Sequence, residues 1–281
     1  MVFPGQGSQA KGMGGDLFDS VTEFTSVEPQ VDEILGYSMR DLCLNDSNDQ
    51  LGQTQFTQPA LYVVNALNYY NAINDGGKPE YLAGHSLGEY NALLAGGAFD
   101  FLTGLKLVQK RGELMAQAKD GGMAAIIGID ADAIQKVLTE NNFDGIDVAN
   151  FNSPSQTVIS GPVDQLNNAE NAFKDAGVKL YKVLPVSAAF HSRYMASAGE
   201  EFAAFLNQFT FEELHTPVIA NVTAEPYPTN DEATAKELLV KQISGSVQWT
   251  QSIHYLKNLG ESDFLEVGPG KVLSRLIKQI D

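Results

Sequence analysis

The pentad Gly84-His85-Ser86-Leu87-Gly88 limits what this chain can fold into more than any other stretch. An apolar run at 81–83 precedes it, and helix-forming residues at 89–94 follow it. This order predicts a strand, a sharp turn and a helix, which hold the serine hydroxyl clear of its own backbone. The first amides of such a helix point at the oxyanion that forms when serine attacks a carbonyl. The pentad therefore predicts acyl chemistry; the alternative is an ordinary glycine-rich turn.

The residues around the pentad predict an α/β fold with a largely parallel sheet, because strands and helices alternate there. A strand at 1–3 and helical segments at roughly 12–43 and 57–74 come before it. The same alternation returns near the C-terminus. We expect a strand at 218–222, helices at 233–243 and 250–259, a strand at 264–267 and a final helix.

A different order separates these two parts. The patterns predict strands at 123–129, 146–149, 157–160 and 179–186, with helices at 131–140 and 163–176. This βαββαβ order is that of a ferredoxin-like unit, and Gly121-Gly122 and Ser187-Ala188 are predicted hinges at its ends. We therefore expect a large, α/β-hydrolase-like subdomain of residues 1–121 and 188–281 and an inserted small subdomain of residues 122–187. A ligand cleft is expected between them.

Composition and charge exclude several functions. A net charge of −17 argues against a nucleic-acid binder, because binding to phosphates depends on Lys and Arg. No apolar run approaches a membrane span, and residues 1–5 do not resemble a signal peptide, so we expect a cytoplasmic protein that binds no membrane. The single cysteine, Cys43, has no partner for a disulfide and no neighbours at metal-ligand spacing, so no metal site is expected.

A nucleophilic serine needs a base, and the chain has four histidines. His191 follows the apolar segment at the second hinge and is the predicted base. His85 should diverge from Ser86, while His215 and His254 lie at a strand entrance and on a helix surface. No acid is singled out as a third member: Asp144, Asp147 and Asp164 are equally placed, and a backbone carbonyl is the alternative.

Arg111 carries the inference about the substrate. In a helix over 101–115 it lies in the middle of the apolar arc, opposite Lys106 and Lys110. An inward guanidinium must meet an anion or hydrogen-bond acceptors, because an unpaired buried charge is costly. Either an internal carboxylate or the carboxylate of a substrate would satisfy it, and Arg holds a carboxylate with two parallel bonds that Lys cannot make.

The glycine-rich stretch at 5–10 offers a function of another class. It fits the G-x-G-x-x-G/A dinucleotide fingerprint, but Asp32 and Glu33, at the distance of the usual ribose-binding acid, fall in a helix-like stretch. An NAD enzyme is thus the weaker hypothesis. This loop is better suited to supply a second oxyanion donor. Lys271, Arg275 and Lys278 share one helix face, which is either a patch for an acidic partner or an ordinary solvated face.

Motifs along almost the whole chain resemble the malonyl-CoA:acyl carrier protein transacylases, and residues 53–60 and the region around His191 look most like the discrete acyltransferases that serve modular polyketide synthases in trans. The matching stretches are Phe3-Pro4-Gly5-Gln6-Gly7-Ser8-Gln9, Gly84 to Glu89, Lys110-Arg111-Gly112, Asn152-Ser153-Pro154, Val186 to Ser192, Pro217 to Val222, Val247-Gln248-Trp249 and Glu266 to Gly270.

The resemblance implies a dyad of Ser86 and His191, with His191 held by the main-chain carbonyl of Gln248. It implies an oxyanion hole formed by the amides of Gln9 and Leu87. It also implies a ping-pong reaction in which a malonyl group moves from malonyl-CoA to Ser86 and then to the thiol of an acyl carrier protein, with no further cofactor.

The resemblance also assigns the substrate contacts. Arg111 would hold the malonyl carboxylate, and Asn152 would line the cleft. Leu87 and Phe190 accompany malonyl preference in this family, whereas Ala188 departs from its usual His, which weakens the expected rejection of methylmalonyl. With His191 as base at its ordinary pKa, we expect activity to fall below about pH 6.5. An acyl hydrolase, a fatty-acid malonyl transferase and a catalytically silent docking module are the alternatives.

Overall fold

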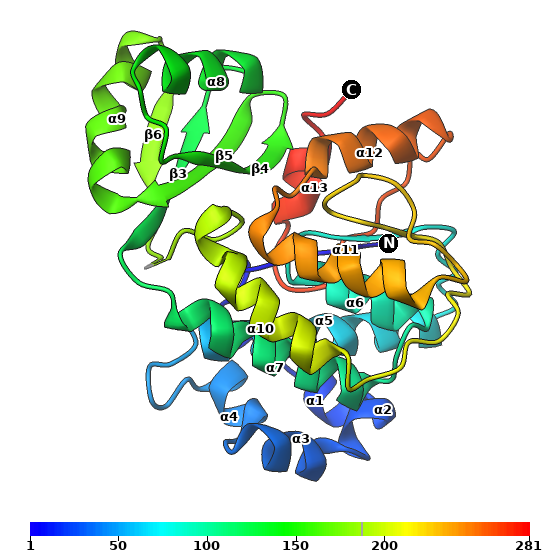
Figure 1. Cartoon of the computed structure of the whole chain (residues 1–281). Helices are drawn as coiled ribbons and strands as arrows, with labels where there is room; N and C mark the ends of the chain where they lie inside the picture. Colours follow the sequence, from blue (N-terminus) through cyan, green and yellow to red (C-terminus); the bar gives the residue numbers. More distant parts are fainter. Residues whose placement is uncertain (187) are drawn as a thin grey trace.

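The computed structural model describes residues 1–186 and 188–281; Ser187, one of the predicted hinge residues, lies outside them. Two sheets organise the chain, a three-stranded parallel sheet and a four-stranded antiparallel sheet. Figure 1 shows the antiparallel sheet and its two helices as a separate unit at the upper left, apart from the helices that surround the parallel sheet. The predicted combination of a parallel sheet and a second, ferredoxin-like unit is confirmed.

The parallel sheet has the order β1-β2-β7 and consists of β1 (Val2–Phe3), β2 (Leu82–Gly84) and β7 (Val218–Ile219). Successive strand residues point to opposite faces. One residue of each strand packs into the main core, and its neighbour packs into a second core built around Trp249. Both faces are therefore covered, as a parallel sheet requires.

Helices from the N-terminal third and the C-terminal region enclose this sheet. The first third contains α1 (Leu17–Ser20), α2 (Thr22–Thr25), α3 (Glu28–Leu35), α4 (Met39–Leu44) and α5 (Thr54–Asn74). After β2 come α6 (Gly88–Gly96) and α7 (Phe101–Gln117). The C-terminal part adds the 3₁₀ turn Arg193–Met195, α10 (Ala196–Leu206), α11 (Glu232–Ser244), α12 (Trp249–Asn258) and α13 (Val272–Ile277). Residues 57–67 of α5 are buried all round, which makes α5 the central helix of the main core.

The antiparallel sheet has the order β4-β5-β3-β6, which is the ferredoxin-like order. Its elements are β3 (Gly121–Ile127), α8 (Ala131–Glu140), β4 (Asp147–Ser153), β5 (Gln156–Pro162), α9 (Val163–Asp175) and β6 (Leu180–Val183). Ala124 and Ile126 of β3 pack against the helices, whereas Met123 and Ala125 face the other way. The second face of this sheet thus becomes a wall of the cavity described below.

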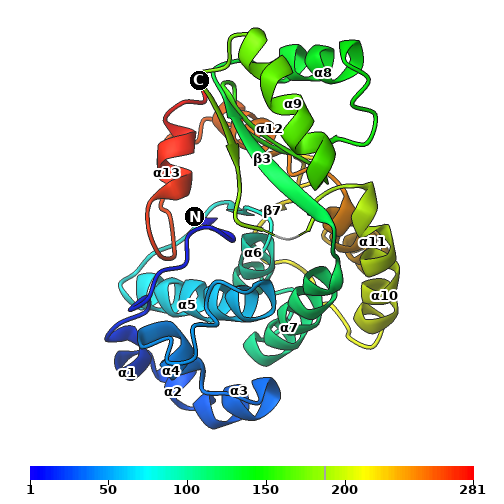
Figure 2. The same ribbon diagram turned by 90° about the vertical axis from the view of Figure 1, so that its left-hand side faces the viewer.

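Two connections join the two units, and they lie in contact. Figure 2 shows β3 running out of the antiparallel sheet toward α7. At its first residue, Gly121, an added Cβ would lie 2.5 Å from the backbone nitrogen of Ala189 on the returning segment. Only glycine permits this approach. The boundaries at 122 and 187 stay a prediction.

The segment at 264–267 differs from its prediction, because it forms no strand. A single parallel bridge joins Glu266 to Val2, supported by backbone bonds from Val2 to Leu265 and from Val267 to Val2. The Glu266 carboxylate instead accepts from the backbone amides of Leu273 and Ser274 at the start of α13, and the chain turns away at Gly268. No helix among the described residues combines the length and the apolar character needed to cross a membrane.

Candidate active site

Ser86 lies in the predicted sharp turn between β2 and α6. Its φ is +52°, a left-handed conformation that is uncommon for any residue with a side chain. Gly84 and Gly88 make the turn possible: an added Cβ on Gly84 would lie 1.9 Å from the carbonyl carbon of Gly88, and one on Gly88 would lie 2.1 Å from the carbonyl oxygen of Phe3. The glycines of the pentad therefore permit the packing that projects the serine side chain.

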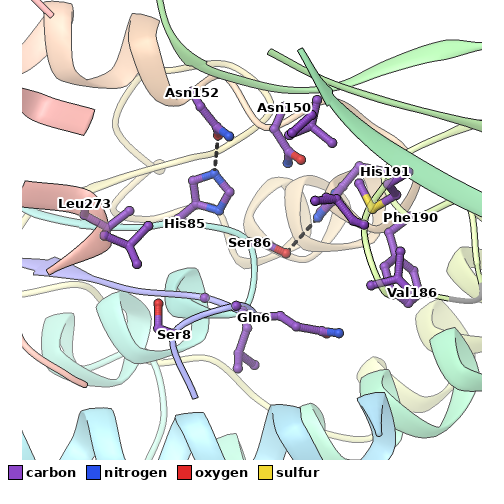
Figure 3. A pocket seen from close by; sticks show the side chains of 18 of the residues that line it. Gln6, Ser8, His85, Ser86, Asn150, Asn152, Val186, Phe190, His191 and Leu273 are labelled. Atoms are coloured by element: carbon purple, nitrogen blue, oxygen red, sulfur yellow. Dashed lines mark hydrogen bonds between the residues drawn. The ribbon is translucent and has the colours of Figure 1, made fainter. Parts of the chain in front are cut away.

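His191 meets Ser86 across this turn. Its Nε2 lies 2.7 Å from the Ser86 Oγ (Figure 3), and its Nδ1 lies 2.8 Å from the Gln242 carbonyl oxygen and 3.2 Å from that of Gly245. Because carbonyl oxygens only accept, Nδ1 carries the proton and Nε2 is free to accept from the serine. Gln248 was expected to hold this ring, and that expectation is wrong, since its carbonyl accepts from Ser252 in the first turn of α12.

His191 is 4% exposed, and its environment keeps the ring neutral. Burial and, after it, the positive charge of Arg111 lower its pKa to about 3. The sequence-based expectation of an acid limb near pH 6.5 is therefore corrected, because it used the pKa of an exposed imidazole. At neutral pH the ring is a proton acceptor.

Arg111 of α7 is 1% exposed, as its place on the apolar arc predicts. Its Nη1 donates to the Gln58 Oε1 at 2.7 Å, and its Nη2 donates to the Gln242 Oε1 at 2.9 Å and to the Ser86 Oγ at 3.1 Å. Its Nε has no partner, and no carboxylate among the described residues lies within ion-pair distance. The internal salt bridge that was the alternative is absent from this part of the chain.

These groups open onto a cavity of about 350 Å³ between the two sheets. The large unit contributes Ser86, Arg111 and Gln58, and the small unit contributes the outward-facing side chains of β3, β4 and β5. Leu87 and Phe190 line the cavity and are nearly buried. Asn152 lines it too, and its Oδ1 lies 2.8 Å from the Nε2 of His85 (Figure 3). His85 therefore diverges from Ser86, as expected, and reaches across to β4.

Two backbone amides without a protein acceptor in the described chain, those of Leu87 and Gln6, belong to residues that line this cavity. Gln9, the expected second oxyanion donor, is not among the lining residues, and its side chain accepts from the amide of Gly7 at 2.7 Å. The loop turns back at Gly7, where φ is +105°, and this brings Gln6 rather than Gln9 beside the pentad.

The remaining candidates lie elsewhere. His215 contacts the hydroxyl of Thr216, and His254 lies half-buried on α12. Asp147 pairs with Arg193, and no described carboxylate accepts from His191. The stretch at 5–10 opens no helix, since α1 begins only at Leu17, so the geometry of a dinucleotide-binding turn is missing. Among the described residues no group of three His, Cys, Asp or Glu is arranged to hold a metal ion.

Sequence reasoning missed several polar residues that surround the dyad. Gln58 and Gln242 accept from Arg111, Asn221 accepts from the Ser86 amide at 2.7 Å, and Glu89 accepts from Gln242. One signal was available for two of them: Gln58 and Glu89 are polar side chains inside helical stretches that are mostly apolar. Such residues need internal partners.

Comparisons with known proteins agree with this geometry. Residues 1–280 match the acyl transferase domain family. The chain is 52% identical to the polyketide biosynthesis malonyl CoA-acyl carrier protein transacylase PksC of Bacillus subtilis, over 99% of this chain and 96% of that protein. It is 44% identical to the malonyl CoA-acyl carrier protein transacylase of Synechocystis, over 99% and 92% of the two chains.

Solved structures of malonyl transacylases have the same fold as this chain. The malonyl CoA-acyl carrier protein transacylase of Burkholderia pseudomallei superposes with a TM-score of 0.94 at 51% identity, over 99% of this chain and 96% of that one. A malonyl-transacylase in complex with a type II polyketide synthase acyl-carrier protein superposes with a TM-score of 0.93 at 35% identity, over 100% and 92%. The resemblance drawn from the motifs is confirmed, and the chain belongs to the acyl transferase domain family.

Proposed function

We propose that this chain moves a malonyl group from malonyl-CoA, through an ester on Ser86, to the pantetheine thiol of an acyl carrier protein. One observation carries the proposal: a single serine oxygen contacts both a neutral imidazole and a buried guanidinium that pairs with no carboxylate of the described chain. The imidazole suits acyl transfer, and the guanidinium suits an acyl group with a free carboxylate.

In the first half-reaction the Ser86 Oγ forms a bond to the thioester carbon, and His191 Nε2 takes the serine proton. The amides of Leu87 and Gln6 are the proposed donors to the oxyanion. Stabilisation of an oxyanion is strongest where the donors are already in place. The carbon–sulfur bond then breaks, and the coenzyme A sulfur leaves with the proton that His191 held. The Gln242 and Gly245 carbonyls stabilise the imidazolium formed in between.

In the second half-reaction the carrier thiol gives its proton to His191 and attacks the ester carbon. The bond from carbon to Ser86 Oγ breaks, and the serine recovers the proton. The same imidazole thus serves both halves, and the proposed reaction needs no metal or further cofactor.

Arg111 is the proposed clamp for the malonyl carboxylate. Gln58 and Gln242 fix its guanidinium by accepting from Nη1 and Nη2, yet these are neutral partners, and Glu89 reaches the guanidinium only through Gln242, so no carboxylate of the described chain pairs with it directly. A substrate carboxylate supplies that direct partner. A neutral acyl group does not, which makes hydrolytic clearing of neutral acyl chains the weaker function for this site.

The acceptor is proposed to be a carrier domain of a polyketide synthase, served in trans, because relatives at about half identity are named for polyketide biosynthesis. We also propose a cytoplasmic location, which suits the free, buried thiol of Cys43. Lys271 and Lys278 flank α13, and Arg275 lies within it; the helix also carries Leu273 and Leu276, which line the cavity. These three cations are the proposed local contact for an acidic carrier.

The test is intact mass spectrometry after brief mixing with malonyl-CoA, followed by addition of a carrier protein that bears a free pantetheine thiol. We expect a malonyl adduct on the wild type, its transfer to the carrier faster than its hydrolysis, and no adduct on Ser86→Ala. Loss of the adduct to water whether or not a carrier is present would favour the hydrolase. An adduct that persists on Ser86→Ala would contradict the proposed nucleophile.

A further inference from the structure

Glu89 is a fully buried carboxylate that the proposed reaction does not use. It lies in the first turn of α6, three residues after Ser86, and its exposed fraction is 0%. Its Oε1 accepts from the Asn221 amide at 2.9 Å and the Tyr227 hydroxyl at 2.7 Å, and its Oε2 accepts from the Gln242 Nε2 at 2.6 Å. The start of α6 also favours a negative charge here. Both oxygens are therefore occupied by donors.

Gln242 links this carboxylate to all three groups of the site. Its Nε2 donates to Glu89 and to the Ser86 carbonyl oxygen at 2.7 Å, while its Oε1 accepts from the Arg111 Nη2. Its main-chain carbonyl accepts from His191. The side-chain amide has a donor end and an acceptor end, so its function toward Arg111 depends on which end faces the guanidinium.

A carboxylate at position 89 decides this orientation. An ionised carboxylate only accepts, so it selects the NH₂ end of Gln242 and turns the oxygen toward Arg111. Burial raises the pKa of Glu89 to about 7, while the three donors on its oxygens and the charge of Arg111 oppose that rise and favour the ionised form. The reversed amide would place an NH₂ group against guanidinium donors and an oxygen against the oxygens of Glu89 and Ser86. Asn221 extends the arrangement, since its backbone amide is held by Glu89 while its side chain holds the Ser86 amide and the Gly84 carbonyl.

We propose that Glu89 is a positioning residue that acts through Gln242: it orients that amide so that Arg111 is held ready for the substrate carboxylate. This rests on the proposed malonyl transfer. It predicts that a defect at position 89 falls selectively on acyl donors that carry a carboxylate. A residue that only supported the fold would change all donors alike.

The test compares malonyl-CoA with acetyl-CoA in the acylation of Ser86, followed as single-turnover adduct formation by intact mass spectrometry. In Glu89→Gln the new NH₂ competes with that of Gln242, and we expect kcat/KM for malonyl-CoA to fall about 10- to 100-fold, the range for a buried donor left facing a donor. Acetyl-CoA should change less than about threefold, because its acyl group has no charge for Arg111 to hold.

Two further variants separate a general effect on packing from an effect that reaches Arg111 through Gln242. Tyr227→Phe removes a hydrogen bond to the other oxygen of Glu89 and should keep the wild-type ratio of malonyl to acetyl. Gln242→Ala should lower that ratio by itself, and adding Glu89→Gln to it should have no further effect, because the two residues act as one unit. If Glu89→Gln does not fold, an unchanged ratio in Gln242→Ala still overturns the proposal.

An unchanged ratio in a folded Glu89→Gln or in Gln242→Ala overturns the proposal, as does an additive double variant. Failure of the proposed function looks different, since the wild type would then form no malonyl adduct. Glu89→Asp keeps a carboxylate and should keep the ratio even where both rates fall, which separates the chemistry of the group from its volume.

Discussion

The cavity has two unlike walls. The large-subdomain wall (Ser86, Arg111 and Gln58, with Gln242 behind them) carries polar groups that bond to one another, beside apolar side chains such as those of Leu87 and Met115. The small-subdomain wall (Met123, Ala125, Asn150, Asn152, Gln156 and Val158) carries no charged side chain among these residues, and a hydrogen bond between Asn152 and His85 reaches across the cavity. One wall is organised for charge and proton transfer, and the other encloses the substrate.

This difference follows from the elements behind each wall. Helices α5, α6, α7 and α11 converge on the large-subdomain wall, so polar residues from four segments meet in the interior, where every donor needs an acceptor. A single pleated sheet lies behind the small-subdomain wall and can offer only its alternate side chains. Substitutions should therefore have large, coupled effects on the first wall and small, separable effects on the second.

The largest effect is expected for Ser86→Ala. Removing the nucleophile from a coupled dyad costs about four to six orders of magnitude in kcat, because the base has nothing left to activate. Malonyl transfer to a carrier measures the rate, and melting temperature confirms the fold. Residual transfer within tenfold of the wild type would show that the large-subdomain wall is not the reactive one.

Arg111→Ala comes next. We expect malonyl transfer to fall by roughly two to four orders of magnitude while transfer of neutral acyl groups is kept or gained, since Arg111 is the one Lys or Arg side chain among the described residues that line the cavity. Arg111→Lys is the matched variant and should recover part of the loss, because it restores the charge without the fork. Equal losses with malonyl-CoA and acetyl-CoA would argue against the clamp.

Phe190 lies between the walls, on the segment that returns from the small unit, and is 6% exposed. Phe190→Ala should raise the rate with methylmalonyl-CoA relative to malonyl-CoA by about 10- to 100-fold, the range for one methyl group in a tight pocket. Competition between the two donors, read as adduct masses on Ser86, gives the ratio. An unchanged ratio would place the steric control elsewhere.

On the small-subdomain wall, Asn152→Ala should lower kcat/KM by only about 2- to 12-fold, the cost of one hydrogen bond, and equally for malonyl-CoA and acetyl-CoA. Asn150→Ala is the matched variant, since Asn150 lines the same wall and its side chain makes no hydrogen bond to a described residue. It should have the smaller effect. A loss confined to malonyl-CoA in Asn152→Ala would mean that this wall also recognises charge.

The sequence predicts the fold and the large-subdomain wall unequally well. Strand and helix periodicity was sufficient for both sheets, and it failed at 264–267, where only two backbone hydrogen bonds form and no side-chain pattern distinguishes a bridge from a strand. Ser86 and Arg111 are predictable because each stands out from the residues around it: the serine lies between two glycines after a strand, and the arginine lies on the apolar side of a helix. The contacts of the Gln242 side chain are not predictable, because the sequence of a polar helix does not indicate which side chains a glutamine on it will contact.

Two errors share a physical cause. The partner of His191 is a main-chain carbonyl, and a carbonyl leaves no mark on the sequence, so Gln242 and Gly245 could not be distinguished from Gln248. The oxyanion donor proposed in the N-terminal loop is likewise a main-chain amide, and the chain turns back at Gly7 so that Gln6 and not Gln9 lines the cavity. Backbone groups in irregular segments are located only by the structure.

The smallest effect concerns pH, where the environment of His191 predicts almost no change in the activation of Ser86. Burial also raises the pKa of Glu89 to about 7, but the proposed effect of that carboxylate falls on Arg111 and not on the proton transfer. Burial lowers the pKa of His191 to about 3, so the ring stays a base from pH 8 down to pH 5 and is lost only as the pH approaches 3. Labelling of Ser86 by a fluorophosphonate measures this activation without a substrate carboxylate, and its rate should be flat between pH 5 and 8. His191→Ala should label slowly at every pH. An inflection near pH 6.5 in the wild type would mean that this imidazole titrates like one in water. The contrast between a reactive wall that depends on burial and an enclosing wall would then fail.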